Sequence, residues 1–469
     1  MDINEFVKQV KNKEIDIVEH TKQVLAKCKK INDEYHYFNE ISSELALSQA
    51  QNLKKNPVGR LAGVAVSVKD CLCVKGVQSR GGSAVLNGYK PVFNATAVQK
   101  LIDEGAIIIG KTAQDEFGFG SFSTNVGNGL DIPLNPFDKT RACGGSSGGS
   151  GGITQVADFA HVSLGESTGG SIVAPASFCG VVGFCPTYGR VSRYGLMDYA
   201  NSLDKIGAMT KKISDTALVQ ELISGYDNKE STTLNSPVDK YSDWLSQDVK
   251  GQRIGIIKEC FGEGVDEQVS KHVWNGIKKL EDAGVKYDEV SLPLVKKYGV
   301  ETYYLIAMSE TSTNLAKYCG MRYGAHDKLK EGFNDYFSKV RSKNFGKEAK
   351  RRIIIGTFAR MAGFRDAYYM KAMAVRTKII NEYKSHFKKY KALVSPTMPI
   401  LPPTFKEIEK LTPLQNYMMD IMTVGSNLAG MPHVNINVGK SNGLPVGMLM
   451  TADHLKERRL FQLGGVFEK

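Results

Sequence analysis

The chain has 469 residues, of which 42% are hydrophobic and 23% are charged. This is the composition of a globular protein that is long enough to bury a large core. The net charge is +12, but the 61 basic residues are spread among 49 acidic ones and form no long basic run. A solvated surface is therefore favoured over a dedicated nucleic-acid arm.

The eight cysteines form no C-x-x-C pair and stand at no metal-like spacing from histidine. This argues against a zinc site and against a disulfide framework, so we expect no metal and reduced thiols. The N-terminus carries acids from its second residue and lacks an apolar core, which argues against a signal or transit peptide. No apolar run approaches the ~20 residues of a membrane span. We expect a cytoplasmic protein without a membrane segment, or an organellar matrix protein if a targeting segment was removed.

The predicted elements begin with helices over 1–55, where apolar residues recur at three- and four-residue spacing. The pattern then changes to a strand over 63–70, a helix over 95–105 that ends at a glycine, and a strand over 106–110. The order helix, glycine, strand recurs over 266–293. This alternation predicts an α/β fold.

The second half of the chain continues with a polar stretch over 226–250, which predicts a surface loop. Residues 300–390 are mainly helical in pattern, and 390–399 reads as a strand that ends in a proline-rich loop. The pair Asn442-Gly443 separates two strand patterns and predicts a tight hairpin. No internal repeat is visible, so we expect one large domain.

Two motif matches fail on physical grounds. Residues 105–112 fit the phosphate-loop pattern, but the central Ala-Ile-Ile-Ile forms a strand, and a phosphate cradle needs a flexible loop. Ser146 and Ser147 both fit G-x-S-x-G, but a polar loop precedes them in place of the apolar strand of a nucleophile elbow. Of the late histidines only His433 and His454 are placed to complete such a triad, and a lone histidine is more often structural.

Lys69 ends the strand pattern over 63–70 and is followed by Asp70. Taken alone, it is best read as a strand-end lysine that reaches water or pairs with Asp70. Beside a serine cluster it has a second interpretation. Burial lowers the pKa of a lysine from about 10.4, and a neutral amine can act as a base.

The glycine-rich tract resembles the amidase signature family, and within it the glutamine-hydrolysing subunits of tRNA-dependent amidotransferases. The resemblance covers nearly the whole chain and is carried by SVKD (67–70), GGSSGGSGG (144–152), the tract 165–195, and the segments 202–210, 303–324, 350–372 and 426–439. It implies a mixed, twisted central sheet covered by helices on both faces, in a single domain over 1–469. The signature core with the catalytic residues would span 60–215, and 300–390 would form the helical part of the substrate pocket.

The resemblance also implies a catalytic set. Ser171 matches the nucleophile, Ser146 a serine in a cis peptide, and Lys69 the base. In the implied reaction Lys69 accepts a proton from Ser146, which takes one from Ser171 as it attacks the carboxamide of glutamine. The backbone N–H groups implied to stabilise the oxyanion belong to Thr168, Gly169 and Gly170.

Substrate recognition follows from the same resemblance. Arg352, with Arg351 beside it, matches the cation for the α-carboxylate of glutamine, Asp420 the anion for its α-ammonium group, and Tyr303 a pocket residue. Without the resemblance, Arg352 and Asp420 would be read as solvated helix positions.

The family implies that ammonia passes to a partner, which uses ATP to convert Glu-tRNA(Gln) to Gln-tRNA(Gln). This partner, a second kind of subunit, would bind tRNA, ATP and Mg²⁺, often together with a small third subunit, and no cofactor is expected in this chain. Two alternatives remain open: a free-standing amidase for another small amide, and a catalytically impaired structural subunit of the same complex.

The tract departs from the family pattern at three positions. Ser167 stands where the family has Asp, Val173 where it has Arg, and Cys185 where it has Lys. The missing carboxylate at Ser167 removes expected support for the loop, which the Ser167 hydroxyl or an inward-turned Glu166 would replace. None of the three changes falls on the catalytic set, so we expect activity.

Overall fold

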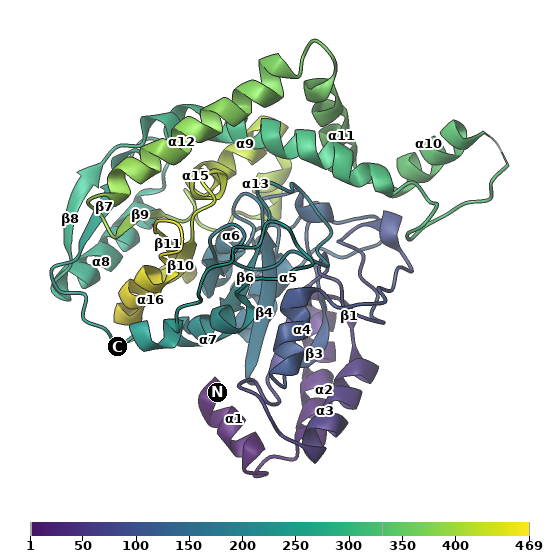
Figure 1. The fold of residues 1–469 in the computed structure, drawn as a ribbon, viewed down its shortest axis with the longest axis horizontal. Coiled ribbons are helices and arrows are strands. Elements are labelled where there is room, and N and C mark those ends of the chain that lie inside the picture. Colours follow the sequence, from purple (N-terminus) through teal and green to yellow (C-terminus); the bar gives the residue numbers. More distant parts are fainter. Residues whose placement is uncertain (1, 331, 469) are drawn as a thin grey trace.

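A single mixed sheet of eleven strands runs through the protein, with helices packed on both of its faces (Figure 1). The structure is a computed structural model and describes residues 2–330 and 332–468. The strand order is β1-β3-β2-β4-β6-β5-β10-β11-β9-β7-β8. The expected α/β architecture with a mixed central sheet is confirmed.

The strands are β1 (Phe38–Ile41), β2 (Ala65–Lys69), β3 (Ile107–Thr112), β4 (His161–Ser167), β5 (Val182–Cys185), β6 (Lys205–Thr210), β7 (Arg253–Ile257), β8 (Lys286–Val290), β9 (Ala392–Pro396), β10 (His433–Ser441) and β11 (Leu444–Thr451). The α-helices of the first half are α1 (Ile3–Lys11), α2 (Ile17–Tyr35), α3 (Ser43–Lys55), α4 (Thr96–Asp103), α5 (Gly148–Val156), α6 (Val173–Cys179) and α7 (Ile213–Ile223). Those of the second half are α8 (Glu267–Asp282), α9 (Pro293–Asn314), α10 (Phe333–Asn344), α11 (Lys347–Arg360), α12 (Lys371–Phe387), α13 (Phe405–Glu409), α14 (Pro413–Met418), α15 (Val424–Leu428) and α16 (Glu457–Gly464).

The neighbouring strands β2 and β4 place the catalytic segments at one edge of the sheet. They run parallel, with Val68 opposite Leu164. Parallel strands end at the same edge, and in α/β sheets ligands bind outside the carboxyl ends of the strands. The end of β2 at Lys69 therefore lies beside the end of β4 and the glycine-rich turn that follows it.

Local chemistry explains the elements that the sequence predicted. Gly105 ends α4 with φ +82°, a conformation that favours glycine, and β3 follows directly. The whole of β3 is buried, so the phosphate-loop match at 105–112 is a core strand. Asn442 (φ 51°) and Gly443 (φ 79°) form the predicted hairpin turn between β10 and β11.

Two segments differ in detail from their sequence patterns. The strand β1 lies inside the region predicted as N-terminal helices and pairs antiparallel with β3. Sheet pairing outweighs local propensity there, and a four-residue strand carries too little pattern to be recognised. The polar stretch 226–250 contains Tyr241, which is fully buried and stacks on Phe461.

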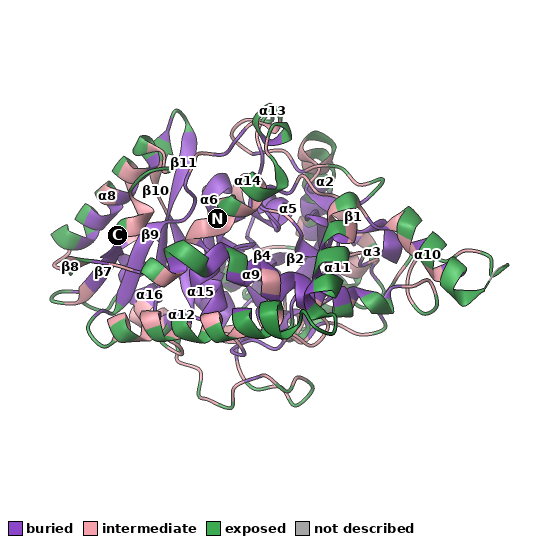
Figure 2. Ribbon diagram, turned by 90° about the horizontal axis from the view of Figure 1, so that it is seen from above, coloured by how far each residue is buried: buried purple, intermediate pink, exposed green. Residues whose placement is uncertain are grey.

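The helices α9, α11 and α12 form a layer on one side of the molecule, seen from above in Figure 2. Helix α9 packs against both of the others, and its inner face carries buried tyrosines. The outer faces of α11 and α12 are largely exposed (Figure 2). Over the described residues, no helix combines the length and apolar character needed to cross a bilayer.

Candidate active site

Lys69 and Ser146 meet in the interior at the end of β2. The Lys69 ammonium nitrogen Nζ lies 2.7 Å from Ser146 Oγ, and both side chains are fully buried. Ser146 precedes α5, and the Gly145–Ser146 peptide bond is cis, as the resemblance implied. The structure thus brings together two residues that are 77 positions apart in the sequence.

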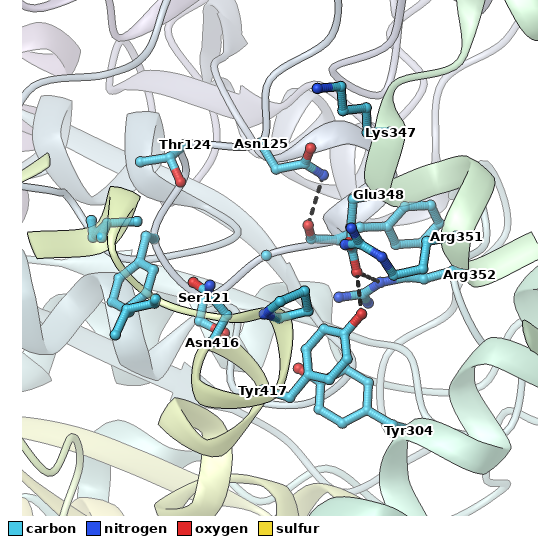
Figure 3. A pocket seen from close by; sticks show the side chains of 16 residues that line it. Ser121, Thr124, Asn125, Tyr304, Lys347, Glu348, Arg351, Arg352, Asn416 and Tyr417 are labelled. Carbon is cyan, nitrogen blue, oxygen red and sulfur yellow. Dashed lines mark hydrogen bonds and ion pairs between the residues drawn. The ribbon is translucent and has the colours of Figure 1, made fainter. Parts of the chain in front are cut away.

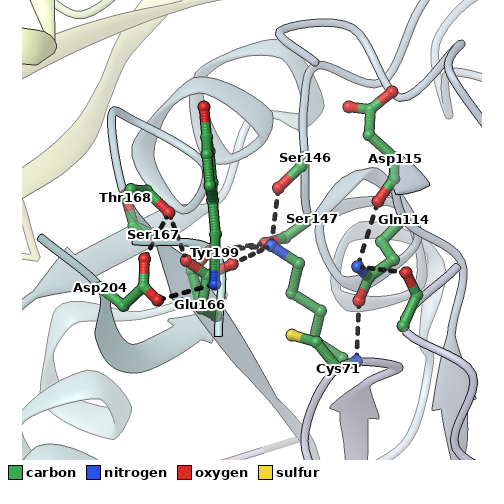
Figure 4. Close-up of polar contacts among 12 residues, drawn as sticks. Cys71, Gln114, Asp115, Ser146, Ser147, Glu166, Ser167, Thr168, Tyr199 and Asp204 are labelled. Atoms are coloured by element: carbon green, nitrogen blue, oxygen red, sulfur yellow. Dashed lines mark hydrogen bonds and ion pairs between the residues drawn. The ribbon is translucent and has the colours of Figure 1, made fainter. Parts of the chain in front are cut away.

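Glu166 makes a further contact with Lys69 that was not predicted from the sequence. Its carboxylate oxygen Oε2 lies 2.8 Å from Lys69 Nζ, and its backbone carbonyl also accepts from Nζ at 2.9 Å. Glu166 is buried as well (Figure 4). Desolvation alone was expected to decide the protonation of Lys69, but a buried carboxylate at this distance stabilises the ammonium form.

Ser171 lies in the turn between β4 and α6. Its backbone carbonyl accepts a hydrogen bond from Ser147 N at 3.2 Å, which ties its turn to the segment that carries Ser146. Ser171 is 7% exposed, whereas Lys69 and Ser146 are at 0%. Of the three predicted catalytic side chains, Ser171 is therefore the one open to solvent and so to a substrate.

The glycines before Ser171 are required by packing. A Cβ atom on Gly169 would lie 2.5 Å from the ring of Tyr303, and one on Gly170 would lie 2.3 Å from Thr423 Oγ1. Gly170 also adopts φ +150°, and its N–H donates to Ser167 Oγ at 3.1 Å. The Gly170 donor, predicted for the oxyanion, is therefore engaged by the Ser167 hydroxyl in this structure.

The departures at Ser167 and Cys185 lie next to each other. Both side chains are fully buried, and the Cys185 thiol lies beside the hydroxyl of Ser167 and the ammonium group of Lys205. Burial raises the pKa of Cys185, so this thiol is neutral. An uncharged pair thus occupies the two positions where the family pattern has Asp and Lys, and Val173 is buried as the first residue of α6.

Asp115 supports the loop that carries Ser146, a role that was not predicted from the sequence. Its carboxylate accepts hydrogen bonds from Ser123 N (3.0 Å) and Asn125 N (2.8 Å), and its own N–H donates to Ser146 O at 3.2 Å. A Cβ on Gly145 would lie 2.3 Å from this carboxylate. Burial raises the pKa of Asp115 to about 6.

A cavity of about 340 Å³ opens near the catalytic segments (Figure 3). Its wall includes Ser121, Tyr304, Glu348, Arg352 and Tyr417. The carbonyl of Ser121 accepts from Gly145 N at 2.8 Å, so this cavity wall is bonded to the residue before Ser146.

Arg352 projects from α11 into this cavity region and is 2% exposed, so the reading as a solvated helix position is wrong. Its Nε donates to Glu348 Oε1 at 2.8 Å, and its Nη1 donates to the hydroxyl of Tyr199. The guanidinium also lies over the rings of Tyr304 and Tyr417. Its remaining nitrogen, Nη2, has no protein acceptor among the residues that the structure describes. The neighbouring Arg351 is exposed.

Asp420 and Tyr303 lie close to the same region. Asp420 accepts hydrogen bonds from Ser121 Oγ (2.8 Å) and from the hydroxyl of Tyr304 (2.6 Å). Burial raises the pKa of Asp420. Tyr303 is buried edge-on against Tyr304 and rests on Gly169, so it joins the cavity wall to the turn before Ser171.

Comparison with known proteins identifies the group to which the chain belongs. The sequence model of the family described as Amidase matches residues 19–461. The chain belongs to the amidase family. Its amidase-family fold extends over the whole sheet, from the N-terminal helices to α16.

Several amidase-family relatives share an identical name. The chain is 42% identical over 474 aligned positions to the glutamyl-tRNA(Gln) amidotransferase A subunit of Microcystis aeruginosa, with 100% of this chain and 97% of the relative covered. It is 44% identical to the protein of that name from Methanococcoides burtonii, covering 91% of this chain and 89% of the relative.

Solved structures agree with this assignment. The crystal structure of the glutamyl-tRNA(Gln) amidotransferase A subunit from Thermotoga maritima matches with a TM-score of 0.81 and 33% identity, covering 98% of this chain and 93% of that chain. The peptide amidase of Stenotrophomonas maltophilia matches with a TM-score of 0.81 at 24% identity, covering 100% of this chain and 96% of that chain, which shows a shared fold.

Proposed function

We propose that this chain is the glutamine-hydrolysing subunit of a glutamyl-tRNA(Gln) amidotransferase. The observation that carries the proposal is the buried contact between Lys69 and Ser146, in a chain that is 42% identical over its full length to A subunits of that enzyme. In the proposed reaction glutamine is hydrolysed to glutamate and ammonia.

The chemistry uses three side chains. Ser171 Oγ forms a bond to the carboxamide carbon of glutamine as its proton passes to Ser146, whose own proton passes to Lys69. The backbone N–H groups of Thr168, Gly169 and Gly170 are the proposed donors to the oxyanion. Collapse of the intermediate expels ammonia, which takes the proton back through Ser146. Water then attacks the acyl-enzyme and releases glutamate.

The cavity offers groups of the right charge for the two ends of glutamine. We assign the α-carboxylate to Arg352, whose Nη2 has no protein acceptor among the described residues, and the α-ammonium group to Asp420. Tyr303 contributes a wall. Glu348 competes for Arg352, because its carboxylate is already paired with the guanidinium at 2.8 Å. Binding of the α-carboxylate therefore requires Arg352 to serve two anions.

The ammonia has to reach a second active site, so we propose a heteromeric complex. A partner that binds tRNA, ATP and Mg²⁺, here called the transferase partner, would carry out the transfer onto Glu-tRNA(Gln), and a small third subunit would complete the complex. Exposed apolar side chains on α11 and the following turn support a partner surface: Ile354, Ile355, Phe358, Met361, Phe364 and Tyr368. The eight free cysteines fit a reducing compartment, for which we propose the cytoplasm.

The proposal is tested by glutamine hydrolysis with purified protein, alone and with the transferase partner and Glu-tRNA(Gln). Ser171→Ala should abolish glutamate release, and Ser147→Ala, a neighbouring serine outside the proposed relay, should retain it. An active Ser171→Ala protein would contradict the mechanism. Strong turnover of other amides without any partner would favour a free-standing amidase. A folded chain that an amide-directed acylating inhibitor does not label at Ser171 would indicate a structural subunit.

A further inference from the structure

The surroundings of Lys69 Nζ are those of an ammonium ion. Three oxygen atoms accept from it: Ser146 Oγ at 2.7 Å, the Glu166 carbonyl at 2.9 Å and Glu166 Oε2 at 2.8 Å. An ammonium group has three N–H donors, one for each acceptor. A neutral amine has two, and the hydrogen bond to Ser146 must then reverse so that the serine hydroxyl donates to the nitrogen lone pair. Only the reversed arrangement lets Lys69 take a proton from Ser146.

Glu166 is the charged member of its own network. Thr168 Oγ1 lies 2.8 Å from both Glu166 Oε1 and Asp204 Oδ1, yet a hydroxyl has one proton and cannot donate to two carboxylates. The pKa of Asp204 is raised well above its usual value, by burial and by the charge of Glu166. Asp204 therefore keeps its proton and donates it to Thr168, which donates to Glu166. Glu166 remains an anion that faces Lys69 (Figure 4).

The other ionisable groups around Lys69 leave this contact as the dominant one. Asp70 is matched by Lys111, whose Nζ lies 3.5 Å from its carboxylate, and both are buried. Burial raises the pKa of Asp115 to about 6, and its carboxylate is held by backbone N–H groups. Burial also raises the pKa of the Cys71 thiol, which stays neutral.

On the other side of Glu166, toward β5 and β6, lie Cys185, Lys205 and Tyr199. Burial keeps Cys185 neutral by raising its pKa, and it lowers the pKa of Lys205, whose Nζ donates to a backbone carbonyl at 3.2 Å. The Tyr199 hydroxyl accepts from Arg352. Neither Cys185 nor Tyr199 supplies a competing anion, so the pair of Glu166 and Lys69 is a local unit.

We propose that Glu166 is a positioning residue of the hydrolytic reaction, which holds Lys69 as an ammonium ion and thereby sets the pH above which Lys69 can accept a proton from Ser146. This proposal rests on the proposed function for the choice of glutamine as substrate. Removing the carboxylate removes the stabilisation of the ammonium form, so Lys69 becomes a base at lower pH. Glu166 itself touches neither substrate nor the reacting atoms.

The experiment compares pH profiles of kcat/KM for glutamine hydrolysis in wild type, Glu166→Gln and Glu166→Asp, with the partner subunits present. In Glu166→Gln the acidic limb should move down by one pH unit or more, which raises the rate below the limb by about tenfold per unit. Glu166→Asp keeps the charge but shortens the side chain, and its limb should fall between the other two. Glu221→Gln is the matched control, because Glu221 is a mostly buried carboxylate paired with Arg60, and its limb should stay at the wild-type position.

A second readout separates this proposal from the assignment of glutamine as substrate. Phenylmethylsulfonyl fluoride forms a bond from sulfur to Ser171 Oγ and loses fluoride, and mass spectrometry follows the rate at each pH. If glutamine is not hydrolysed but the sulfonylation limb moves down in Glu166→Gln, the substrate assignment fails and the role of Glu166 stands. A limb that does not move in either assay overturns the proposal. Loss of labelling at every pH in folded Glu166→Gln also overturns it, because Glu166 would then be needed as a proton acceptor.

Discussion

Replacement of Lys69 should remove activity and stability together, because this residue has two roles. In Lys69→Met no base remains to take the proton of Ser146, so glutamine hydrolysis should be lost. The same change leaves the Glu166 carboxylate buried without the cation that lies 2.8 Å from it in the wild type. Breaking a buried ion pair from one side typically destabilises a protein by about 3–5 kcal/mol. We expect a loss of that order in the free energy of unfolding, reduced to the extent that Glu166 takes up a proton.

The double variant Lys69→Met, Glu166→Gln separates the two effects. It removes both charges, so most of the lost stability should return, while hydrolysis stays absent. Urea unfolding at pH 7.5 gives the stability of the wild type, both single variants and the double variant, and glutamate release gives the activity. If Lys69→Met is as stable as the wild type, or if the second change restores nothing, the buried pair does not exist as described. Activity in either Lys69 variant would refute the role of Lys69 as base.

Three further outcomes follow from individual contacts. Arg352→Gln should raise KM for glutamine at least about tenfold through loss of the charged partner, whereas the exposed Arg351→Gln should change it little; equal effects would contradict the assignment. Gly169→Ala should lower kcat, because its Cβ would meet the ring of Tyr303 at 2.5 Å, and an unaffected kcat would show that the turn has room. Burial, with repulsion from a nearby aspartate, raises the pKa of Asp215 to about 7 from its usual 3.8. Its folded form therefore favours the proton, and stability is lost as pH rises toward 7. Asp215→Asn should thus gain about 2 kcal/mol more relative to wild type at pH 8 than at pH 5, measured by urea unfolding, and an equal gain at both pH values would contradict it.

The sequence carried enough pattern to predict much of the sheet. Long apolar runs such as β3 and the hairpin turn at Asn442-Gly443 follow local rules, so their positions were predictable. The edge strand β1 was not, because its four residues owe their conformation to pairing with β3. The order of the strands likewise depends on contacts between distant segments.

The site divides in the same way. Motif spacing was enough to select Lys69 and Ser146, and the structure places them in contact at 2.7 Å. It did not reveal the ion pair with Glu166, although this residue lies in the motif itself, because only the parallel register of β2 and β4 brings the two strand ends together. Burial of Arg352 was also hidden, since α11 shows no clear apolar stripe and the aromatic groups that cover the guanidinium come from other segments.

The central claim is that Ser171 attacks glutamine and supplies ammonia for transfer to Glu-tRNA(Gln). The most direct measurement is formation of Gln-tRNA(Gln) by the complex of this chain with the transferase partner, ATP and Mg²⁺, using either glutamine or free ammonium as the nitrogen donor. We expect the wild type to use both donors, and Ser171→Ala to use ammonium alone. A Ser171→Ala complex that still transfers nitrogen from glutamine, or a wild-type complex that uses only ammonium, would contradict the account.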